Sequence, residues 1–153
     1  MPATMDDDFK SRVLVLCTGN SARSQMAEGL INARLADRFT ARSAGTRPSG
    51  YVHPQAVAAL REIGIDISGQ RSKSLTEFIG QPFDLIITVC DDAAENCPVW
   101  FGQGQRVHIG FPDPAAAPVD QQPAAFRAVR DAIAEQVIGY LTRWQPAADR
   151  RSA

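Results

Sequence analysis

The sequence predicts an α/β fold in which helices cover both faces of an open, mostly parallel sheet. Short β-like runs alternate with helical patterns along the 153 residues, as such a sheet requires. Two of the runs, residues 11–16 and 83–89, are rich in Val, Ile and Leu without polar alternation. That composition is typical of strands buried on both faces. A chain of this length can bury the core of one domain without disulfide bonds.

The remaining elements follow in order along the chain. Weaker strand patterns occupy residues 40–43 and 107–109. Apolar residues three and four apart predict three helices, and a shorter helix is expected at residues 75–79. The apolar faces are Met26, Leu30, Ile31 and Leu35 in the first helix, Val57, Leu60 and Ile63 in the second, and Phe126, Val129, Ile133, Val137, Tyr140, Leu141 and Trp144 in the last. Pro54 suits the first turn of the second helix, and Gly64 suits its end.

The two ends of the chain differ from the part between them. Residues 1–10 are acidic and residues 146–153 are polar. We therefore expect one domain at residues 11–145 between two flexible ends.

Charge and hydropathy exclude several classes of protein. The net charge of −1 gives no reason to expect nucleic acid or an anionic membrane as a partner. No apolar run approaches the ~20 residues that a membrane-spanning helix needs. Asp6, Asp7 and Asp8 stand where a secretory signal would carry positive charge. These observations predict a cytoplasmic protein.

The three cysteines are informative because thiols stay reduced in the cytoplasm. An odd number is a poor disulfide framework, so reactive or metal-binding thiols are the better interpretations. Cys17, Cys90 and Asp113 all fall at or just after the ends of predicted strands. Ligands of open α/β sheets bind beyond the carboxyl ends of the strands, so these residues indicate one site.

The loop CTGNSARS, residues 17–24, joins the first strand to the first helix. Gly19 and Asn20 tolerate left-handed backbone, so the loop can curl with its N–H groups inward. Together with the first helical turn, these amides form a site for a tetrahedral oxyanion, and Arg23 would clamp two of its oxygens. The candidate binding residues are Thr18, Gly19, Asn20, Ser21, Ala22, Arg23 and Ser24.

The same positive field favours a nucleophilic thiolate at Cys17, and Ser24 is placed to donate a hydrogen bond to its sulfur. The alternative is a buried structural thiol at Cys17 with Arg23 on the helix surface. Cysteine, five residues, arginine and serine at a strand–helix junction favour the oxyanion loop.

This loop resembles the signature of the low-molecular-weight protein tyrosine phosphatase superfamily, Cys-x5-Arg-Ser at the first strand–helix turn. The resemblance implies a single-domain, four-stranded parallel sheet and a cysteine that attacks a bound phosphoryl group. It also implies a general acid in a later Asp-Pro pair, which matches Asp113-Pro114 in this sequence.

Two further cysteines, in VCDDAAENCPVW, narrow the resemblance. With CTGNSARSQMAEG, YVHPQAVAALREIGIDIS and GFPDPA, the chain resembles the thioredoxin-coupled arsenate reductases from about residue 12 to 144. The resemblance implies that Cys17 attacks arsenate while Asp113 protonates the departing oxygen. Cys90 would then attack the Cys17 sulfur and release arsenite. Cys97 would move the disulfide to Cys90–Cys97, which thioredoxin would reduce.

Residues 91–96 are too few for a stable isolated helix, so we expect a marginal helix that unwinds when the final disulfide forms. Taken alone, Cys90 and Cys97 also fit zinc ligands, core thiols or a permanent disulfide. Their spacing exceeds that of common zinc sites, and we expect neither a metal nor a cofactor. We expect a monomer by default.

Some relatives bind potassium beside the loop through residues that match Asn20, Glu28 and Ser43, together with an acidic residue. The acidic position corresponds to Lys73 here. A lysine cannot ligate a cation, so we expect its ammonium group to neutralise Glu28 and the activity to be independent of potassium.

Two other functions stay open at this stage. One is a low-molecular-weight tyrosine phosphatase, although Ala115 and Ala116 occupy positions where such phosphatases usually carry aromatic residues. The other is a non-enzymatic oxyanion-binding or redox-sensing module. The reductant is also open between thioredoxin, a glutaredoxin and another thiol system.

Overall fold

The computed structural model describes residues 10–91, 100 and 102–146. Its four strands form one parallel sheet in the order β2-β1-β3-β4. The strands are β1 (Ser11–Cys17), β2 (Phe39–Gly45), β3 (Leu85–Thr88) and β4 (Gln105–His108). The predicted open parallel sheet is therefore confirmed, including its two weaker strands.

The predicted helices are present as α2 (Arg23–Arg34), α3 (Pro54–Arg61) and α4 (Gln122–Arg143). The short helix expected at residues 75–79 is the 3-10 helix η1 (Leu75–Phe78). The Ser74 hydroxyl accepts from the Thr76 amide at its start, and Gly80 has φ +87° just after its end. Two further 3-10 helices, η2 (Pro114–Ala116) and η3 (Val119–Gln121), precede α4.

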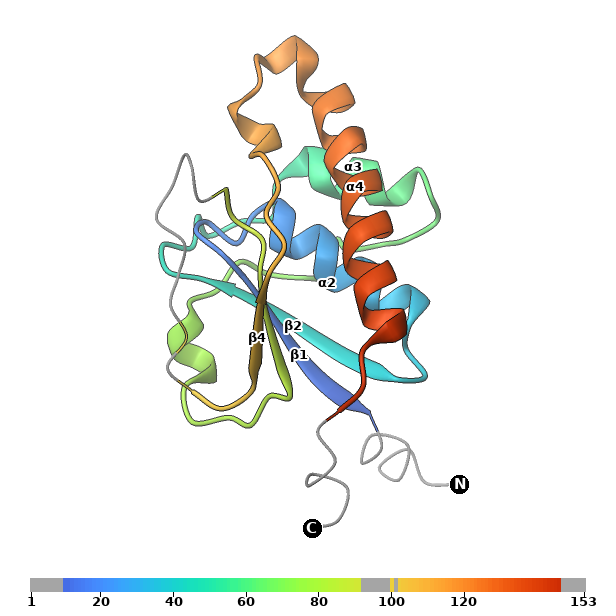
Figure 1. Cartoon of the computed structure of the whole chain (residues 1–153). Helices are drawn as coiled ribbons and strands as arrows, with labels where there is room; N and C mark the ends of the chain where they lie inside the picture. The colour runs from blue at the N-terminus through green and yellow to red at the C-terminus, as the bar shows by residue number, and fades with distance from the viewer. Residues whose placement is uncertain (1–9, 92–99, 101, 147–153) are drawn as a thin grey trace.

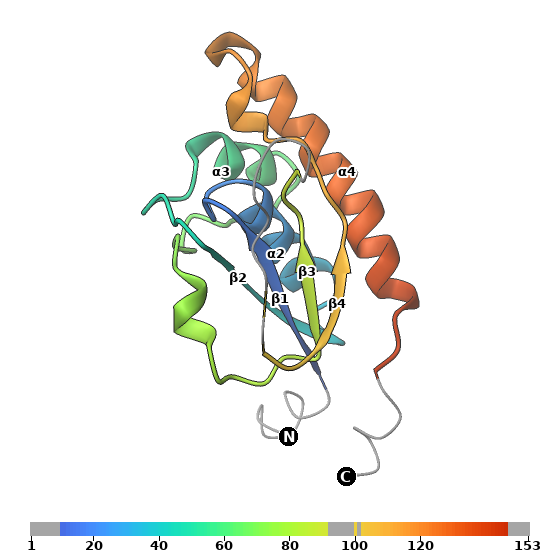
Figure 2. The same ribbon diagram turned by 60° about the vertical axis from the view of Figure 1, so that its left-hand side comes forward.

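Both faces of the sheet are covered, as the continuous apolar strands predict. Val13 and Val15 of β1 belong to a buried cluster with residues of α2, α3 and α4. Leu14 and Leu16 point the other way, into a cluster with Phe78 and other aromatic residues. Three α-helices thus cover one face, and η1 with the adjoining segments covers the other (Figures 1 and 2).

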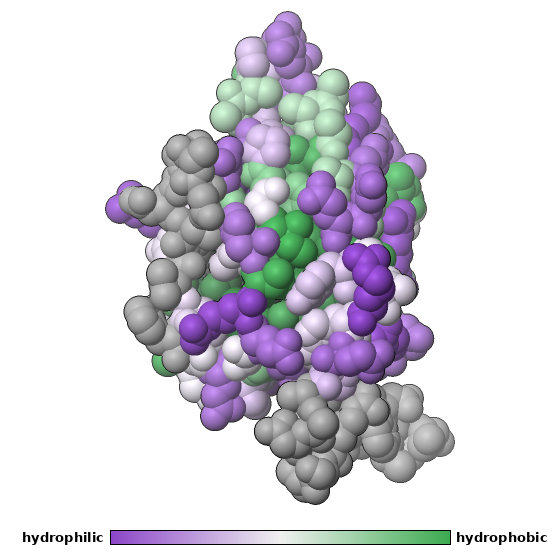
Figure 3. Space-filling view, in the orientation of Figure 1, coloured by the Kyte–Doolittle hydropathy of each residue, from purple (hydrophilic) through white to green (hydrophobic). Residues whose placement is uncertain are grey.

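The surface is mainly hydrophilic on the side that faces the viewer in Figure 1. Figure 3 shows hydrophobic residues gathered between β4 and α4 on this side. Val107 and Ile109, in and just after β4, are only partly buried and pack against the larger cluster. Among the described helices, none combines the length and the apolar character that crossing a bilayer requires.

Several expectations fall outside the described residues. These are the flexible ends at residues 1–9 and 147–153, the marginal helix at residues 91–96 apart from Asp91, and Cys97.

Candidate functional site

The two described cysteines lie at the carboxyl ends of neighbouring strands. Leu16 is in register with Thr88, and the Val89 amide donates to the Leu16 carbonyl over 3.0 Å. Cys17 therefore ends β1 at the same edge of the sheet as Cys90, which follows β3. Both side chains are buried, with Cys17 a free thiol and Cys90 disulfide-bonded.

The segment after β4 reaches the same edge. The Phe111 amide donates to the Val89 carbonyl over 3.1 Å. A Cβ atom on Gly110 would lie 2.8 Å from the Cys90 carbonyl oxygen, so only glycine allows this close approach. Three strand ends thus supply Cys17, Cys90 and the segment that leads to Asp113.

The loop after β1 turns its carbonyl groups outward. Four successive carbonyl oxygens accept hydrogen bonds of 2.9–3.0 Å from groups outside the loop. The Thr18 and Gly19 oxygens accept from the amides of Arg47 and Ser49, respectively. The Asn20 oxygen accepts from the Gln25 side chain, and the Ser21 oxygen accepts from the His53 amide. The C=O and N–H groups of a trans peptide point in opposite directions. The amides of residues 19–22 therefore face the centre of the loop, as an oxyanion site requires.

Asn20 gives the loop its shape. Its φ of 47° makes it the one non-glycine residue with positive φ in the described part of the chain, and it is fully buried. Both Gly19 and Asn20 tolerate left-handed backbone, and the structure uses it at Asn20 and not at Gly19. The Asn20 side chain donates two hydrogen bonds and accepts two, and these four bonds hold this unfavourable conformation.

Helix α2 offers its first-turn amides to the same space. It begins at Arg23, its N-cap residue Ala22 makes no side-chain cap, and its first turn carries no acidic residue. Uncapped first-turn amides and the helix dipole favour a bound anion.

Arg23 and Asp113 are connected through the segment after β4. The Arg23 guanidinium is buried, and its Nη1 donates to the Phe111 carbonyl over 3.2 Å. Asp113 is exposed two residues later, where its Oδ1 accepts from the Ala115 amide over 3.0 Å. Its charge also reaches His53. Asp113 therefore lies near His53, whose amide contacts the loop at Ser21, and its role as an acid stays a prediction.

Ser24 contacts the Cys17 sulfur as the sequence predicts. The distance from Cys17 Sγ to Ser24 Oγ is 2.8 Å. Asn20 Nδ2 donates to the same hydroxyl oxygen over 2.8 Å. Because Ser24 accepts from Asn20, its own proton is available for the sulfur.

His53 begins α3 next to the loop. Its Nδ1 accepts from the Gln55 amide over 3.0 Å, and its ring packs at a tilt against Phe126 with centroids 4.6 Å apart. Burial lowers the pKa of His53, and the charge of Asp113 partly offsets this. The neutral imidazole is therefore the form that caps α3.

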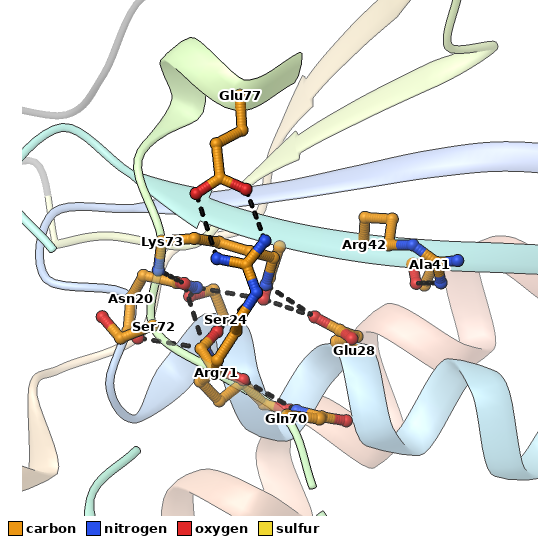
Figure 4. A network of polar contacts seen from close by, with 12 residues as sticks. Asn20, Ser24, Glu28, Ala41, Arg42, Gln70, Arg71, Ser72, Lys73 and Glu77 are labelled. Atoms are coloured by element: carbon orange, nitrogen blue, oxygen red, sulfur yellow. Dashed lines mark hydrogen bonds and ion pairs between the residues drawn. The ribbon is translucent and has the colours of Figure 1, made fainter. Parts of the chain in front are cut away.

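The contact expected between Lys73 and Glu28 is present. Lys73 Nζ lies 3.7 Å from Glu28 Oε1, and both side chains are buried (Figure 4). Ser43 Oγ donates to the same carboxylate oxygen over 2.5 Å. Burial lowers the pKa of Lys73, and the Glu28 carboxylate opposes that shift.

Two residues that support the loop were not predicted. Gly45 lies against it so closely that a Cβ atom would be 2.9 Å from the Cys17 carbonyl oxygen and closer still to that of Thr18. Gln25 donates to the backbone and side-chain oxygens of Asn20, both over 3.0 Å. Two features of the sequence could have indicated these residues: a glycine just after a predicted strand, and a polar glutamine in the first turn of a predicted helix.

Comparison with known proteins agrees with this geometry. Residues 12–149 match the low molecular weight phosphotyrosine protein phosphatase family. The chain belongs to this family. It is 46% identical to the arsenate reductase of Halalkalibacterium halodurans over 130 residues, which cover 84% of this chain and 93% of that relative. It is 43% identical to the arsenate reductase of Bacillus subtilis over 127 residues, covering 82% and 91% of the two chains. Within the phosphatase family, the chain belongs with the arsenate reductases.

Solved structures of this phosphatase family show the same fold. An arsenate reductase in its phosphate binding state superposes with a TM-score of 0.69 at 32% identity, covering 88% of this chain and 99% of that chain. A low molecular weight protein tyrosine phosphatase from T. tengcongensis superposes with a TM-score of 0.60 at 28% identity, covering 85% and 99% of the two chains.

Proposed function

We propose that this chain reduces arsenate to arsenite through a thiol–disulfide relay that starts at Cys17. The observation that carries the proposal is the placement of Cys17 and Cys90 at neighbouring strand ends, beside a loop with inward-facing amides. The loop would bind an oxyanion, and the second cysteine would supply the reducing thiol that phosphate hydrolysis does not need. Relatives named arsenate reductase support this function over most of the chain.

Arsenate would lie against the amides of residues 18–22, the first turn of α2 and Arg23. A structural relative that binds phosphate supports an oxyanion site in this fold. Arsenate has the shape and charge of phosphate, so the same donors fit both. Arg23 has a second function in holding the segment that carries Asp113, through the Phe111 carbonyl.

In the first step, the Cys17 thiolate attacks arsenic. An S–As bond forms, an As–O bond breaks, and the oxygen leaves as water after Asp113 protonates it. The Ser24 hydroxyl, 2.8 Å from the sulfur, stabilises the thiolate before the attack.

In the second step, the Cys90 thiolate attacks the Cys17 sulfur. The S–As bond breaks with its electron pair on arsenic, which is reduced from As(V) to As(III), and a Cys17–Cys90 disulfide forms. Cys97 then attacks Cys90 by thiol–disulfide exchange and restores the Cys17 thiolate. At the end of the relay Cys17 would again be a free thiol and Cys90 would be disulfide-bonded, which is the state that the structure holds.

Thioredoxin would reduce the final disulfide, and the resemblance to thioredoxin-coupled enzymes supports this choice. The enzyme would act as a cytoplasmic monomer. Replacing thioredoxin by glutaredoxin with glutathione in the assay separates the two reductants.

The test is arsenate-dependent NADPH oxidation with purified thioredoxin and thioredoxin reductase. We expect wild-type turnover and a loss of at least about 10³-fold in each of Cys17→Ser, Cys90→Ser and Cys97→Ser, since a hydroxyl cannot replace any thiol of the relay. The matched control is Ser68→Ala, an exposed serine that contacts Asp66. Full turnover by Cys97→Ser would show that another thiol resolves the intermediate.

The alternative is a tyrosine phosphatase that uses Cys17, Arg23 and Asp113, and the family match favours it as the second candidate. It would hydrolyse an aryl phosphate through Cys17 and ignore arsenate. A chain that binds oxyanion or forms the disulfide without turnover would instead be the non-enzymatic module.

A further inference from the structure

We propose that Lys73 is a positioning residue for the Cys17 thiolate, acting through a buried network that contains Asn20, Ser24, Ser43 and Glu28. The inference rests on Cys17 being the nucleophile of the proposed function. Lys73 contacts the network at two separate points, once through its backbone and once through its ammonium group.

The backbone contact sets the orientation of the Asn20 amide group. The Lys73 N–H donates to Asn20 Oδ1 over 2.9 Å, and a backbone N–H can only donate. Asn20 Nδ2 must therefore supply both donors on its other side, to Ser24 Oγ at 2.8 Å and to Ser43 Oγ at 3.0 Å.

The direction of each remaining hydrogen bond follows from that orientation. Ser24 accepts from Asn20, so its proton points to the Cys17 sulfur, which it contacts over 2.8 Å. Ser43 also accepts from Asn20, so its proton goes to Glu28 Oε1 over 2.5 Å. The network thus runs from Asn20 to two anionic ends, the Cys17 thiolate and the Glu28 carboxylate.

The ammonium group of Lys73 neutralises the negative charge at one of those two ends, the Glu28 carboxylate. Lys73 Nζ lies 3.7 Å from Glu28 Oε1, and the two side chains are 7% and 9% exposed. Without this cation, a thiolate at Cys17 would share a buried network with an uncompensated carboxylate. Like charges in a site of low dielectric disfavour each other, so the lysine favours the thiolate.

The other cations nearby have different contacts. Arg71 forms an exposed ion pair with Glu77, and Arg42 donates to the Ala41 carbonyl, away from Glu28 (Figure 4). At the other end of the network, Arg23 contacts the Phe111 carbonyl and the charge of Asp113 reaches His53. Lys73 is the cation paired with Glu28 among the described residues.

Small ions can reach this pair from solvent. Lys73 and Glu28 both line an open cavity of about 530 Å³, whose walls also include Arg42, Gln70 and Arg71. Shortening Lys73 would open more of the Glu28 carboxylate to that cavity. A small cation could then take the place of the ammonium group.

The test follows the rate of Cys17 alkylation by iodoacetamide in the reduced full-length chain, read by mass spectrometry across a pH series. It needs no arsenate, so a chain that failed as an arsenate reductase could still support or contradict this inference. We expect Lys73→Ala to slow alkylation at neutral pH several-fold and to move the midpoint of the profile to higher pH. The matched control, Arg71→Ala, removes an exposed cation from the same cavity and should leave the profile unchanged.

Rescue separates a charge effect from a packing effect. Methylammonium or potassium ions should restore alkylation in Lys73→Ala and leave the wild type unaffected. Lys73→Met removes the same charge but fills the space, so it should slow alkylation without rescue. The double variant Lys73→Ala/Glu28→Gln removes both buried charges and keeps an acceptor for Ser43, so it should return towards the wild-type profile.

The outcomes decide the inference even if Lys73→Ala is unstable, because the double variant carries no unpaired buried charge. A wild-type profile in Lys73→Ala, or a shift of the same size in Arg71→Ala, would overturn it. A double variant that stays as slow as Lys73→Ala would also overturn it, since the lysine would then act by packing alone.

Discussion

At the scale of single residues, the site depends on atoms that make no contact with substrate. Asn20 holds a left-handed conformation because its side-chain amide is bonded at both ends, and two of its partners, Ser43 and Lys73, belong to distant segments of the chain. The orientation of this one amide decides whether Ser24 donates to Cys17. The proposed chemistry therefore also depends on residues that support the loop.

Gly45 gives a direct test of loop shape. In Gly45→Ala, the new Cβ atom would meet the Thr18 and Cys17 carbonyl oxygens, so the loop must move. Displacement of a reacting group by about 1 Å can cost on the order of 10²-fold in rate, and we expect a loss of that order in arsenate reduction. The control is Gly69→Ala, where a Cβ atom would meet nothing within 4 Å. Equal turnover by the two variants would contradict the loop geometry.

At the scale of elements, helix starts perform two different functions. Helix α2 begins without a side-chain cap, which leaves its first amides for an anion. Helix α3 begins with His53 as its cap and is tied to α4 through Glu62, which pairs with Arg127 and Arg130. The uncapped helix fits a ligand site, and the capped helix supports the rim of that site.

The cap of α3 predicts a pH dependence of stability. Burial lowers the pKa of His53 below the ordinary value of 6.5, so the unfolded chain takes up this proton more readily than the folded chain. The free energy of unfolding should therefore fall as pH drops below about 6.5 towards the lower folded pKa. Protonated His53 also cannot accept from the Gln55 amide.

The measurement is urea unfolding of the wild type and His53→Asn between pH 7.5 and about pH 5. Asparagine keeps an acceptor for the cap but does not titrate. The variant should lose part of the pH dependence that the wild type shows. Parallel curves for the two proteins would contradict the role given to His53.

At the scale of the whole molecule, the site is an assembly of strand ends. Cys17 ends β1, Cys90 follows β3, and Asp113 comes after β4, so the site exists only when the sheet is paired. An oxyanion that binds this site should therefore stabilise the entire fold by linkage.

Phosphate is the probe for this linkage. At about 100 times its dissociation constant, a ligand stabilises the folded state by about 2.7 kcal/mol, which corresponds to roughly 5–10 °C in Tm for a domain of this size. We expect this rise in the wild type and its loss in Arg23→Met. Arg143→Met, which removes an exposed cation at the end of α4, should keep the rise. An equal rise in Arg23→Met would place phosphate elsewhere.

Much of the fold was determined by the sequence itself, because it rests on local patterns. Continuous apolar runs predicted β1 and β3. Apolar residues spaced three and four apart predicted α2, α3 and α4. The spacing of Cys17, Arg23 and Ser24 predicted the loop, since all three lie within one strand–helix turn. The partner of Glu28 was also predicted, although only through the resemblance of Lys73 to a family position.

Only the tertiary structure decided how distant segments meet. Periodicity shows which residues are buried but does not identify their partners, so it did not show that the α-helices share one face. It also did not show that Gly45 touches the loop, or that the Lys73 amide reaches Asn20 across 53 positions. These contacts depend on strand order and register, which set the distances between strand ends. The sequence therefore determined the chemical groups of the site, and the pairing of the sheet decided which of them act together.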